Sequence, residues 1–410
     1  MPTQYVVHYA EVALKGKNRP EFVRVLKRNL VRALSGYEPQ VRHSDGRLLL
    51  TAEGPEAEVT ERIGATFGVS WFSPVQSVPA ELRAVRAALL GMAKGAEGTF
   101  KIEARRSDKS FPVKSQEMAA SLGADVAEST GMKVNLATPD RVYHVDVTRG
   151  GAMIYSKRQE GEGGLPVGTA GRVMHLFSGG IDSPVAAWLL MKRGCTPVYL
   201  HFYLASSPAT PLDSKITRLV RVLTRYGGKS TLVLVPFAEY QLGTAGSSGD
   251  LEPSLFRRFM RMTAEALSPW FGASAVSTGD SLSQAASQTL WNLASFDSGS
   301  TLPVLRPLLT FDKEEIISIA RRIGTYGMSI EEYKDCCAIV TRHPRTRVRA
   351  EAITLAVKEL GLEKLMWESV EQSTLVSFNP VSGELKSAPL AESIRKSRMN
   401  GPHRIEAPNP

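Results

Sequence analysis

The sequence predicts an α/β protein in which two α+β units precede a larger unit built on a parallel sheet. Residues 1–163 mix strand and helix patterns, whereas residues 172–388 alternate apolar strands with helices. That alternation is typical of a parallel sheet covered by helices on both faces. The glycine-rich stretch "GEGGLPVGTAG" (161–171) separates the two patterns and predicts a linker. A length of 410 residues favours two or three domains.

Composition limits the class of protein. With 43% hydrophobic and 22% charged residues, the chain has enough apolar mass for folded cores. The net charge of +9 favours a polyanionic partner such as nucleic acid, although a basic enzyme without one explains the charge equally well. Neither a secretory signal nor an apolar run long enough to span a bilayer is visible. We therefore expect a cytoplasmic protein in which any cysteine chemistry is catalytic.

Residues 1–56 predict a small α+β unit. "YVVHYAEVAL" (5–14) is typical of a strand, and "RPEFVRVLKRNLVRAL" (19–34) has apolar residues at helical spacing. Asp45 and Gly46 lie at the centre of an expected hairpin. A stripe of arginines on the helix could meet phosphates, although a solvated helix face is the commoner explanation. These arginines are Arg24, Arg28 and Arg32.

Residues 57–163 predict a second α+β unit. Helical patterns over 80–94 and 115–129 lie between strands such as "TFKIEARR" and "RVYHVDV". The loop "RRSDKSFPVKSQ" gathers basic residues around Phe111, a mixture that nucleic-acid-binding proteins use. The basic residues are Arg105, Arg106, Lys109 and Lys114.

We place the linker at residues 164–171 and the largest unit at 172–388. Its expected strands are "VMHLF", "TPVYLHF", "TLVLVPF" and "SAVST". Residues 389–410, rich in Pro, Asn and basic residues, predict a loose tail.

The segment "HLFSGGIDSPVAAWLL" (175–190) is the clearest functional signal. Pro184 suits the first turn of a helix, so residues 172–202 predict a strand, a helix and a second parallel strand. The loop between strand and helix therefore lies at the carboxyl edge of the sheet and at a helix N-terminus, which favours an anion.

The residues of this loop predict a phosphate site. Gly179 and Gly180 allow close approach of the backbone, and Ser178 and Ser183 supply hydroxyl donors. Asp182 would repel bare phosphate but could hold Mg²⁺ that bridges phosphates. The alternative is a glycine-rich turn capped by Asp or Ser with no ligand.

"SGGIDS" resembles the pyrophosphate loop of the PP-loop ATP pyrophosphatases (adenine nucleotide alpha hydrolase-like). Other segments narrow the resemblance to the tRNA 4-thiouridine synthases, the ThiI family of tRNA sulfurtransferases, over about residues 5–380. They are "YAEVALKGKNRPEF", "GGLPVGTAGRVMHLFSGGIDSPVA", "STGDSLSQAASQTL", "PVLRPLLTFDKEEII" and "IGTYGMSIEEYKDCCAIV". The resemblance implies a ferredoxin-like domain (1–56), a THUMP RNA-binding domain (57–163) and a PP-loop domain, in a form without the rhodanese domain of some members.

The resemblance also implies further ATP contacts. They are Leu176, Phe177, His201, Phe202, Arg257, Gly279 and Gln288. His201 could instead be a packed histidine at a strand end. Arg258 and Arg261 are close alternatives to Arg257, which the alignment favours.

Two further catalytic positions are expected. Lys313 follows Asp312, which predicts a capping box with Glu315, and a lysine in that first turn suits an anionic ligand. By resemblance a cysteine in "YKDCCAIV" handles the transferred sulfur, and both Cys336 and Cys337 remain candidates. Cys195 is expected to be structural.

The implied reaction is ATP-dependent conversion of a uridine in tRNA to 4-thiouridine, at position 8 by resemblance. ATP adenylylates the base, and a cysteine desulfurase supplies sulfur as a persulfide. Three cysteines without a spaced pair make an iron–sulfur cluster an unfavoured carrier. A homodimer is compatible with the resemblance, and a role in thiamine synthesis is not expected without the rhodanese domain. The alternatives are a PP-loop enzyme acting on a small molecule and an RNA-binding protein that senses nucleotide.

Overall fold

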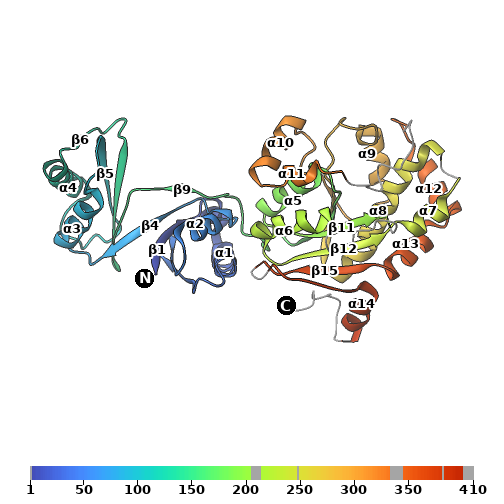
Figure 1. Cartoon of the computed structure of the whole chain (residues 1–410), viewed down its shortest axis with the longest axis horizontal. Helices are drawn as coiled ribbons and strands as arrows, with labels where there is room; N and C mark the ends of the chain where they lie inside the picture. The colour runs from blue at the N-terminus through green and yellow to red at the C-terminus, as the bar shows by residue number, and fades with distance from the viewer. Residues whose placement is uncertain (1, 205–213, 247–248, 333–344, 381–382, 400–410) are drawn as a thin grey trace. The chain divides into compact units, whose positions relative to one another are not determined.

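The computed structural model divides the chain into two compact units, residues 1–164 and 165–410. It describes residues 2–204, 214–246, 249–332, 345–380 and 383–399, with side chains to residue 395. No helix in these ranges is both long and apolar enough to cross a bilayer. Figure 1 shows the elements of each unit.

The first half of the first unit is a helix-backed antiparallel sheet. Its elements are β1 (Thr3–His8), η1 (Glu11–Asn18), α1 (Arg19–Ala33), β2 (Gln40–Ser44), β3 (Arg47–Ala52), α2 (Glu56–Ala65) and β4 (Trp71–Val78). The expected strand over 5–14 ends early, because Glu11–Asn18 turns into a 3₁₀ helix with Gly16 at a φ of +52°. The hairpin is confirmed, and Asp45 and Gly46 both have positive φ, as its two-residue turn requires.

The second half of this unit continues the same sheet. Its elements are α3 (Leu82–Ala93), β5 (Thr99–Arg106), α4 (Ser115–Thr130), β6 (Lys133–Val134), β7 (Arg141–Thr148), β8 (Gly151–Tyr155) and β9 (Gln159–Glu160). Strand β4 pairs with β1 on one side and β8 on the other, so the strand order is β2-β3-β1-β4-β8-β7-β5-β6. Both expected helices and both expected strands are present.

Phe111 corrects one expectation for this unit. Its side chain is 6% exposed and packs in the apolar core with α3 and α4. Burying an aromatic side chain lowers the free energy of the folded state relative to leaving it in water. Because its ring is buried, Phe111 offers no surface for base stacking.

The second unit is a seven-stranded sheet between two layers of helices. Its strands are β10 (Arg172–Leu176), β11 (Thr196–Tyr203), β12 (Ser230–Pro236), β13 (Ala273–Ser277), β14 (Val304–Leu305), β15 (Thr374–Phe378) and β16 (Leu385–Pro389). The strand order is β14-β13-β10-β11-β12-β15-β16, in which the first five strands are parallel to one another, β15 is antiparallel to β12, and β16 is antiparallel to β15. The expected parallel sheet is therefore confirmed for β10 to β14.

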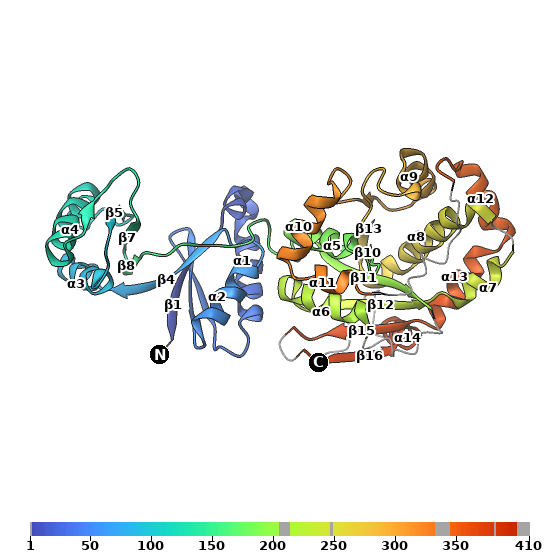
Figure 2. The same cartoon turned by 45° about the horizontal axis from the view of Figure 1, so that its top comes forward.

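Helices cover both faces of this sheet. They are α5 (Asp182–Lys192), α6 (Lys215–Gly227), α7 (Ala238–Thr244), α8 (Glu252–Phe271), α9 (Leu290–Asp297), α10 (Lys313–Arg322), α11 (Tyr326–Ser329), α12 (Ala350–Glu359), α13 (Leu362–Glu371) and α14 (Leu390–Met399), with short 3₁₀ turns η3 (Gly249–Leu251) and η4 (Ala286–Gln288). Figure 2 shows α5 and α6 on one face and α8 and α13 on the other.

The strand order identifies where a ligand should bind. The chain runs from β10 outward through β11 to β12 and later returns to place β13 on the other side of β10. In open α/β sheets, ligands bind beyond the carboxyl ends of the strands at the point where the order reverses. Here that point lies between β10 and β13.

Two expected boundaries are wrong. The predicted linker 164–171 belongs to the second unit from Leu165 onward, because Leu165 and Val167 are buried and the Leu165 N–H donates to the Lys192 carbonyl at 3.0 Å. The predicted loose tail begins with helix α14, which is held by the fully buried side chain of Leu390. In both segments the burial of a few apolar side chains fixes the chain, although the composition of the segment is typical of a loop.

Candidate active site

The loop after β10 is closed by hydrogen bonds among its own residues. The Ser183 hydroxyl accepts from the Ser178 N–H at 3.1 Å and donates to the Ser178 carbonyl at 2.8 Å. Beneath it, the buried His175 imidazole donates from Nε2 to the Ser183 carbonyl at 2.9 Å. Burial lowers the pKa of His175 to about 4, so the ring stays neutral at physiological pH. The two hydrogen bonds of the Ser183 hydroxyl thus fix the conformation of the loop.

Helix α5 begins directly after this loop. No side chain caps its N-terminus. The first-turn N–H groups and the helix dipole therefore favour an anion at this point. His201, 2% exposed at the end of β11, donates from Nδ1 to the Phe177 carbonyl at 2.8 Å. Its side chain both lines the pocket and fixes the start of the loop.

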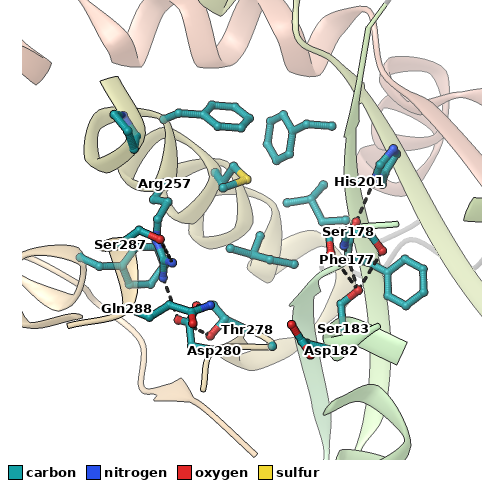
Figure 3. A pocket seen from close by; sticks show the side chains of 18 residues that line it. Phe177, Ser178, Asp182, Ser183, His201, Arg257, Thr278, Asp280, Ser287 and Gln288 are labelled. Atoms are coloured by element: carbon teal, nitrogen blue, oxygen red, sulfur yellow. Dashed lines mark hydrogen bonds and ion pairs between the residues drawn. The ribbon is translucent and has the colours of Figure 1, made fainter. Parts of the chain in front are cut away.

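A pocket opens between this loop and the end of β13 (Figure 3). It contains the predicted ATP-binding residues Leu176, Phe177, Ser178, Asp182, Ser183, His201, Phe202, Arg257, Gly279 and Gln288. Gly179 and Gly180 lie in the same loop, and the remaining wall includes the apolar side chains of Phe256, Met260 and Phe296. The structure therefore brings together residues that lie more than 100 positions apart in the sequence.

The wall opposite the loop is organised by Asp280. Its carboxylate, 4% exposed, accepts from Arg257 Nη2 and Thr278 Oγ1, both at 2.7 Å, and from Arg306 Nε at 3.3 Å. Burial by itself would raise the pKa of Asp280, but the Arg257 guanidinium, the Thr278 hydroxyl and the Arg306 guanidinium together outweigh it and hold the pKa below its usual range. Figure 3 shows Arg257, Asp280 and Thr278 together on this side. The sequence did not lead us to expect Asp280 or Arg306 in the site. Both lie within motifs that carry the family resemblance, "STGDSLSQAASQTL" and "PVLRPLLTFDKEEII", and that position was the available signal.

Gln288 leaves one polar group unused in the same wall. Its Nε2 lies 3.4 Å from Asp280 Oδ1, while its buried Oε1 has no partner. A buried carbonyl oxygen without a partner is costly, and the amino group of a bound ligand would satisfy it. This atom can accept a hydrogen bond from a ligand that carries an amino group, as adenine does.

Gly279, two residues beyond β13, lies against the backbone of the loop. A Cβ atom there would lie 3.0 Å from the Ser183 nitrogen and 3.1 Å from the Asp182 carbonyl carbon. Both neighbours are backbone atoms, so they cannot rotate away as a side chain could. An alanine here would require the loop backbone to shift by a few tenths of an ångström.

The structure distinguishes the three candidate arginines. Arg257 lines the pocket, whereas Arg258 and Arg261 are 6% and 1% exposed. These two donate to the Ser298 carbonyl, and Arg261 also pairs with Glu265 at 2.6 Å. They stabilise the chain after α9, and of the three arginines it is Arg257 that lines the pocket.

Asp182 and Lys313 form an ion pair at the mouth of the pocket. Lys313 Nζ lies 2.7 Å from Asp182 Oδ1, and Gln284 donates to Oδ2 at 2.9 Å. The expected capping box of Asp312 and Glu315 is confirmed and fixes the helix that carries Lys313. Within the described ranges no group of three or more His, Cys, Asp or Glu is placed to hold a metal by itself.

The two candidate sulfur-carrying residues, Cys336 and Cys337, lie outside the described residues. Cys195 is 8% exposed in a core cluster with Val173, Leu190 and Ala275. Burial raises the pKa of its thiol, which makes the reactive thiolate scarce. Cys195 is therefore structural, as expected.

The basic residues of the first unit are partly occupied within it. Arg24 pairs with Glu21 on the exposed face of α1 at 2.9 Å, and burial lowers the pKa of Arg32 on the same helix, which also carries Arg28. Arg106 donates to the Phe111 carbonyl at 2.6 Å, so it stabilises its own loop. Lys109 and Lys114 are exposed in that loop, as is Arg105 on β5.

Comparison with known proteins places this geometry in a family. A "Probable tRNA sulfurtransferase" from Moorella thermoacetica is 40% identical over 385 residues, which is 93% of this chain and 99% of the relative. The chain belongs to the tRNA sulfurtransferase family. A second relative of the same printed name, from Thermus thermophilus, is 40% identical over 90% of this chain and 92% of its own length.

Models of the family's domains match in the order found in the structure. A ThiI ferredoxin-like domain matches residues 4–73, a THUMP domain residues 82–157, and a thiamine biosynthesis protein (ThiI) family residues 168–362. A solved 4-thiouridine synthetase in complex with RNA and ATP is 32% identical, with a TM-score of 0.83 over 94% of this chain and 100% of that one. A protein from Pyrococcus horikoshii, PH1313, is 26% identical with a TM-score of 0.62 over 78% of this chain and 99% of its own. Sulfurtransferase architecture therefore extends over nearly the whole chain.

Proposed function

We propose that the chain replaces the 4-oxygen of a uridine in tRNA by sulfur at the expense of ATP. The observation that carries the proposal is the pocket at the reversal point of the sheet, between the Ser178–Ser183 loop and the Arg257–Asp280 wall. A relative whose solved structure contains both RNA and ATP supports it.

ATP would lie with its phosphates at the N-terminus of α5 and its base toward Gln288. The uncapped helix end supports the first placement, and the unpartnered Gln288 Oε1 supports the second. The uridine O4 then attacks the α-phosphorus, an O–P bond forms, and pyrophosphate departs with the electron pair of the broken bond. Lys313 beside Asp182 supplies positive charge where the phosphates gather.

Magnesium fits this site as an ion shared with the nucleotide. Mg²⁺ is commonly held by one or two carboxylates together with substrate phosphates. Asp182 offers one such carboxylate at the pocket mouth, and the phosphates of ATP would supply the other ligands. When bound, the ion would neutralise phosphate charge.

Sulfur would arrive as a persulfide on Cys336 or Cys337, delivered by a cysteine desulfurase. Its terminal sulfur attacks C4 of the adenylylated base, a C–S bond forms, and AMP leaves. A thiol then attacks the cysteine sulfur of the C4-linked disulfide, which frees the thiouridine and leaves a new disulfide. An external thiol reductant restores the cysteines. No iron–sulfur cluster is needed in this scheme.

The first unit would hold the tRNA. Its match to the THUMP and ferredoxin-like domains and the basic residues of α1 and of the 105–114 loop support this assignment. We further propose that the enzyme acts in the cytoplasm, where tRNA and reduced thiols are present, and that two copies of the chain associate.

Nucleoside analysis tests the proposed function. The purified chain is incubated with unmodified tRNA, ATP, Mg²⁺, cysteine and a cysteine desulfurase, and the tRNA is digested and examined by mass spectrometry. We expect 4-thiouridine and a matching amount of pyrophosphate, neither of which forms without ATP. Pyrophosphate released without tRNA would indicate an enzyme for a small molecule, and ATP binding without any product would indicate a nucleotide sensor.

A further inference from the structure

We propose that an exposed surface beside the pocket holds the RNA strand next to the target uridine. This surface, which we call the Trp291 surface, consists of Leu290, Trp291, Arg345, Arg347 and Arg349. It rests on the proposed function, to which it adds a contact between the catalytic unit and the RNA.

The aromatic part of this surface is unusually open. Trp291 is 61% exposed and its neighbour Leu290 is 68% exposed, both in the first turn of α9. Leaving two large apolar side chains in water forgoes the free energy that burial would provide. An aromatic ring in this setting is typical of a surface that stacks on a partner.

Hydrogen bonds hold the basic part of the surface against the aromatic part. The Thr289 hydroxyl donates to the Thr346 carbonyl at 2.7 Å. Asn292 Nδ2 donates to the Arg345 carbonyl at 2.9 Å, and its Oδ1 accepts from the Val348 N–H at 2.9 Å. Asn292 and Val348 are 4% and 5% exposed, so the segment 345–348 is fixed on α9 by a buried contact.

The charges of the surface match an RNA backbone. Arg345, Arg347 and Arg349 are all exposed, and the guanidinium of Arg347 lies 5.4 Å from the centre of the Trp291 ring. Arg345 also pairs with Asp250. Arginine beside an aromatic ring is a combination that binds single-stranded nucleic acid by stacking and phosphate contacts.

The position of the Trp291 surface beside the pocket favours RNA as its partner. Ser287 and Gln288 line the pocket immediately before α9, and Phe296 lines it from within α9. Trp291 follows Gln288 by three residues. A uridine that enters the pocket must leave its stacked neighbours, and the unstacking costs free energy. A ring beside the pocket would offset that cost by stacking on the base that the uridine leaves behind.

Steady-state kinetics of the full chain test the inference. We compare Trp291→Ala with Trp367→Ala, a control that removes another exposed tryptophan, 41% exposed on α13. We expect Trp291→Ala to raise the KM for tRNA in pyrophosphate release about tenfold. The KM for ATP and the Tm should stay unchanged. Trp291→Phe should have a KM for tRNA close to that of the wild type, because it keeps an aromatic ring, and the control should behave as the wild type.

Arg347→Gln separates the charge from the ring. Its expected result is a smaller rise in the KM for tRNA and a shallower dependence of tRNA affinity on salt, with a log–log slope reduced by about 0.7. An unchanged KM for tRNA in Trp291→Ala would overturn the inference. So would a defect confined to sulfur delivery by the desulfurase, which would assign the surface to a protein partner.

Direct binding keeps this test separate from that of the proposed function. Retention of radiolabelled tRNA on filters is measured for the wild type and both tryptophan variants, without ATP or a sulfur donor. Weaker retention by Trp291→Ala alone supports the surface even if the wild type releases no pyrophosphate, a result that would contradict the proposed function instead. Equal retention by all three proteins contradicts the surface.

Discussion

The ion pair between Lys313 and Asp182 joins residues 131 positions apart at the mouth of the pocket. We expect Lys313→Ala to lower the rate of tRNA-dependent pyrophosphate release about 100-fold, because it removes a charge that stabilises the phosphates. Asp182→Ala should abolish that release while leaving tRNA binding on filters nearly intact. Glu314→Gln, in the same exposed first turn as Lys313, is the matched control. Wild-type pyrophosphate release in either pocket variant would show that the pair has no catalytic part.

The three cysteines should separate into two classes. Removal of the thiol that carries sulfur should leave pyrophosphate release intact and stop thiolation, so Cys336→Ser and Cys337→Ser are compared for both products at the same reductant concentration. A partial defect rescued by dithiothreitol marks the resolving thiol. Cys195→Ala should thiolate normally, since that side chain packs in the core. Continued 4-thiouridine formation by the Cys336, Cys337 double variant would exclude the covalent route.

His175 should make the stability of the second unit depend on pH. Its pKa is lowered from 6.5 to about 4 by burial, so the unfolded chain binds a proton in this range that the folded chain does not. The free energy of unfolding should therefore fall as the pH drops from about 6.5 to about 4, by at most ~1.4 kcal/mol per pH unit. Urea unfolding of His175→Gln, which keeps a donor toward the Ser183 carbonyl, should show a flatter dependence. Identical pH dependence in the two proteins would mean that other groups control it.

Among the elements, the segment after strand β13 and the first turn of helix α5 depend on Gly279 for their close approach. Gly279→Ala places a methyl group 3.0 Å from the Ser183 nitrogen, so the loop must move by a few tenths of an ångström. We expect the KM for ATP to rise about tenfold and stability to fall by about 1–3 kcal/mol. Gly327→Ala in α11, where the added methyl meets nothing within 4 Å, is the control. A wild-type KM for ATP in Gly279→Ala would show that the loop tolerates the shift.

Local patterns predicted most of the elements that carry the site. Strands β10 to β13 and the helix after the phosphate loop follow from apolar runs, from glycines and from Pro184, all of which act over a few residues. The antiparallel pairings of β15 with β12 and of β16 with β15 did not follow, because the direction of pairing depends on partners far along the chain. The Asp280 wall was not predicted for the same reason, because its ion pairs with Arg257 and Arg306 span 23 and 26 positions. The packing of Phe111 and Leu390 also depends on distant core residues.

On the scale of the whole molecule, the two units should be separable. A fragment of residues 165–410 should bind ATP as the full chain does and lose most of the tRNA affinity, because most of the proposed RNA-binding residues lie in the first unit and the Trp291 surface contributes only about tenfold. A shorter fragment, 172–410, should be less stable by roughly 3 kcal/mol, since it lacks the buried side chains of Leu165 and Val167. Filter binding and urea unfolding check both expectations. If the 165–410 fragment retained tRNA as well as the full chain, recognition would lie in the catalytic unit.

The burial of Leu165 also limits how far a bound substrate can move from the pocket. The first unit ends at Gly164, and Leu165 is already fixed to the last turn of α5, so hardly any free chain separates the two units. If the first unit holds the tRNA as proposed, the target uridine would be kept at a high effective concentration near the pocket, on the order of millimolar for a short tether. The pocket itself needs only weak affinity for the uridine. A uridine that leaves the pocket before it is adenylylated could therefore enter it again within the same encounter, while its tRNA stays bound to the first unit.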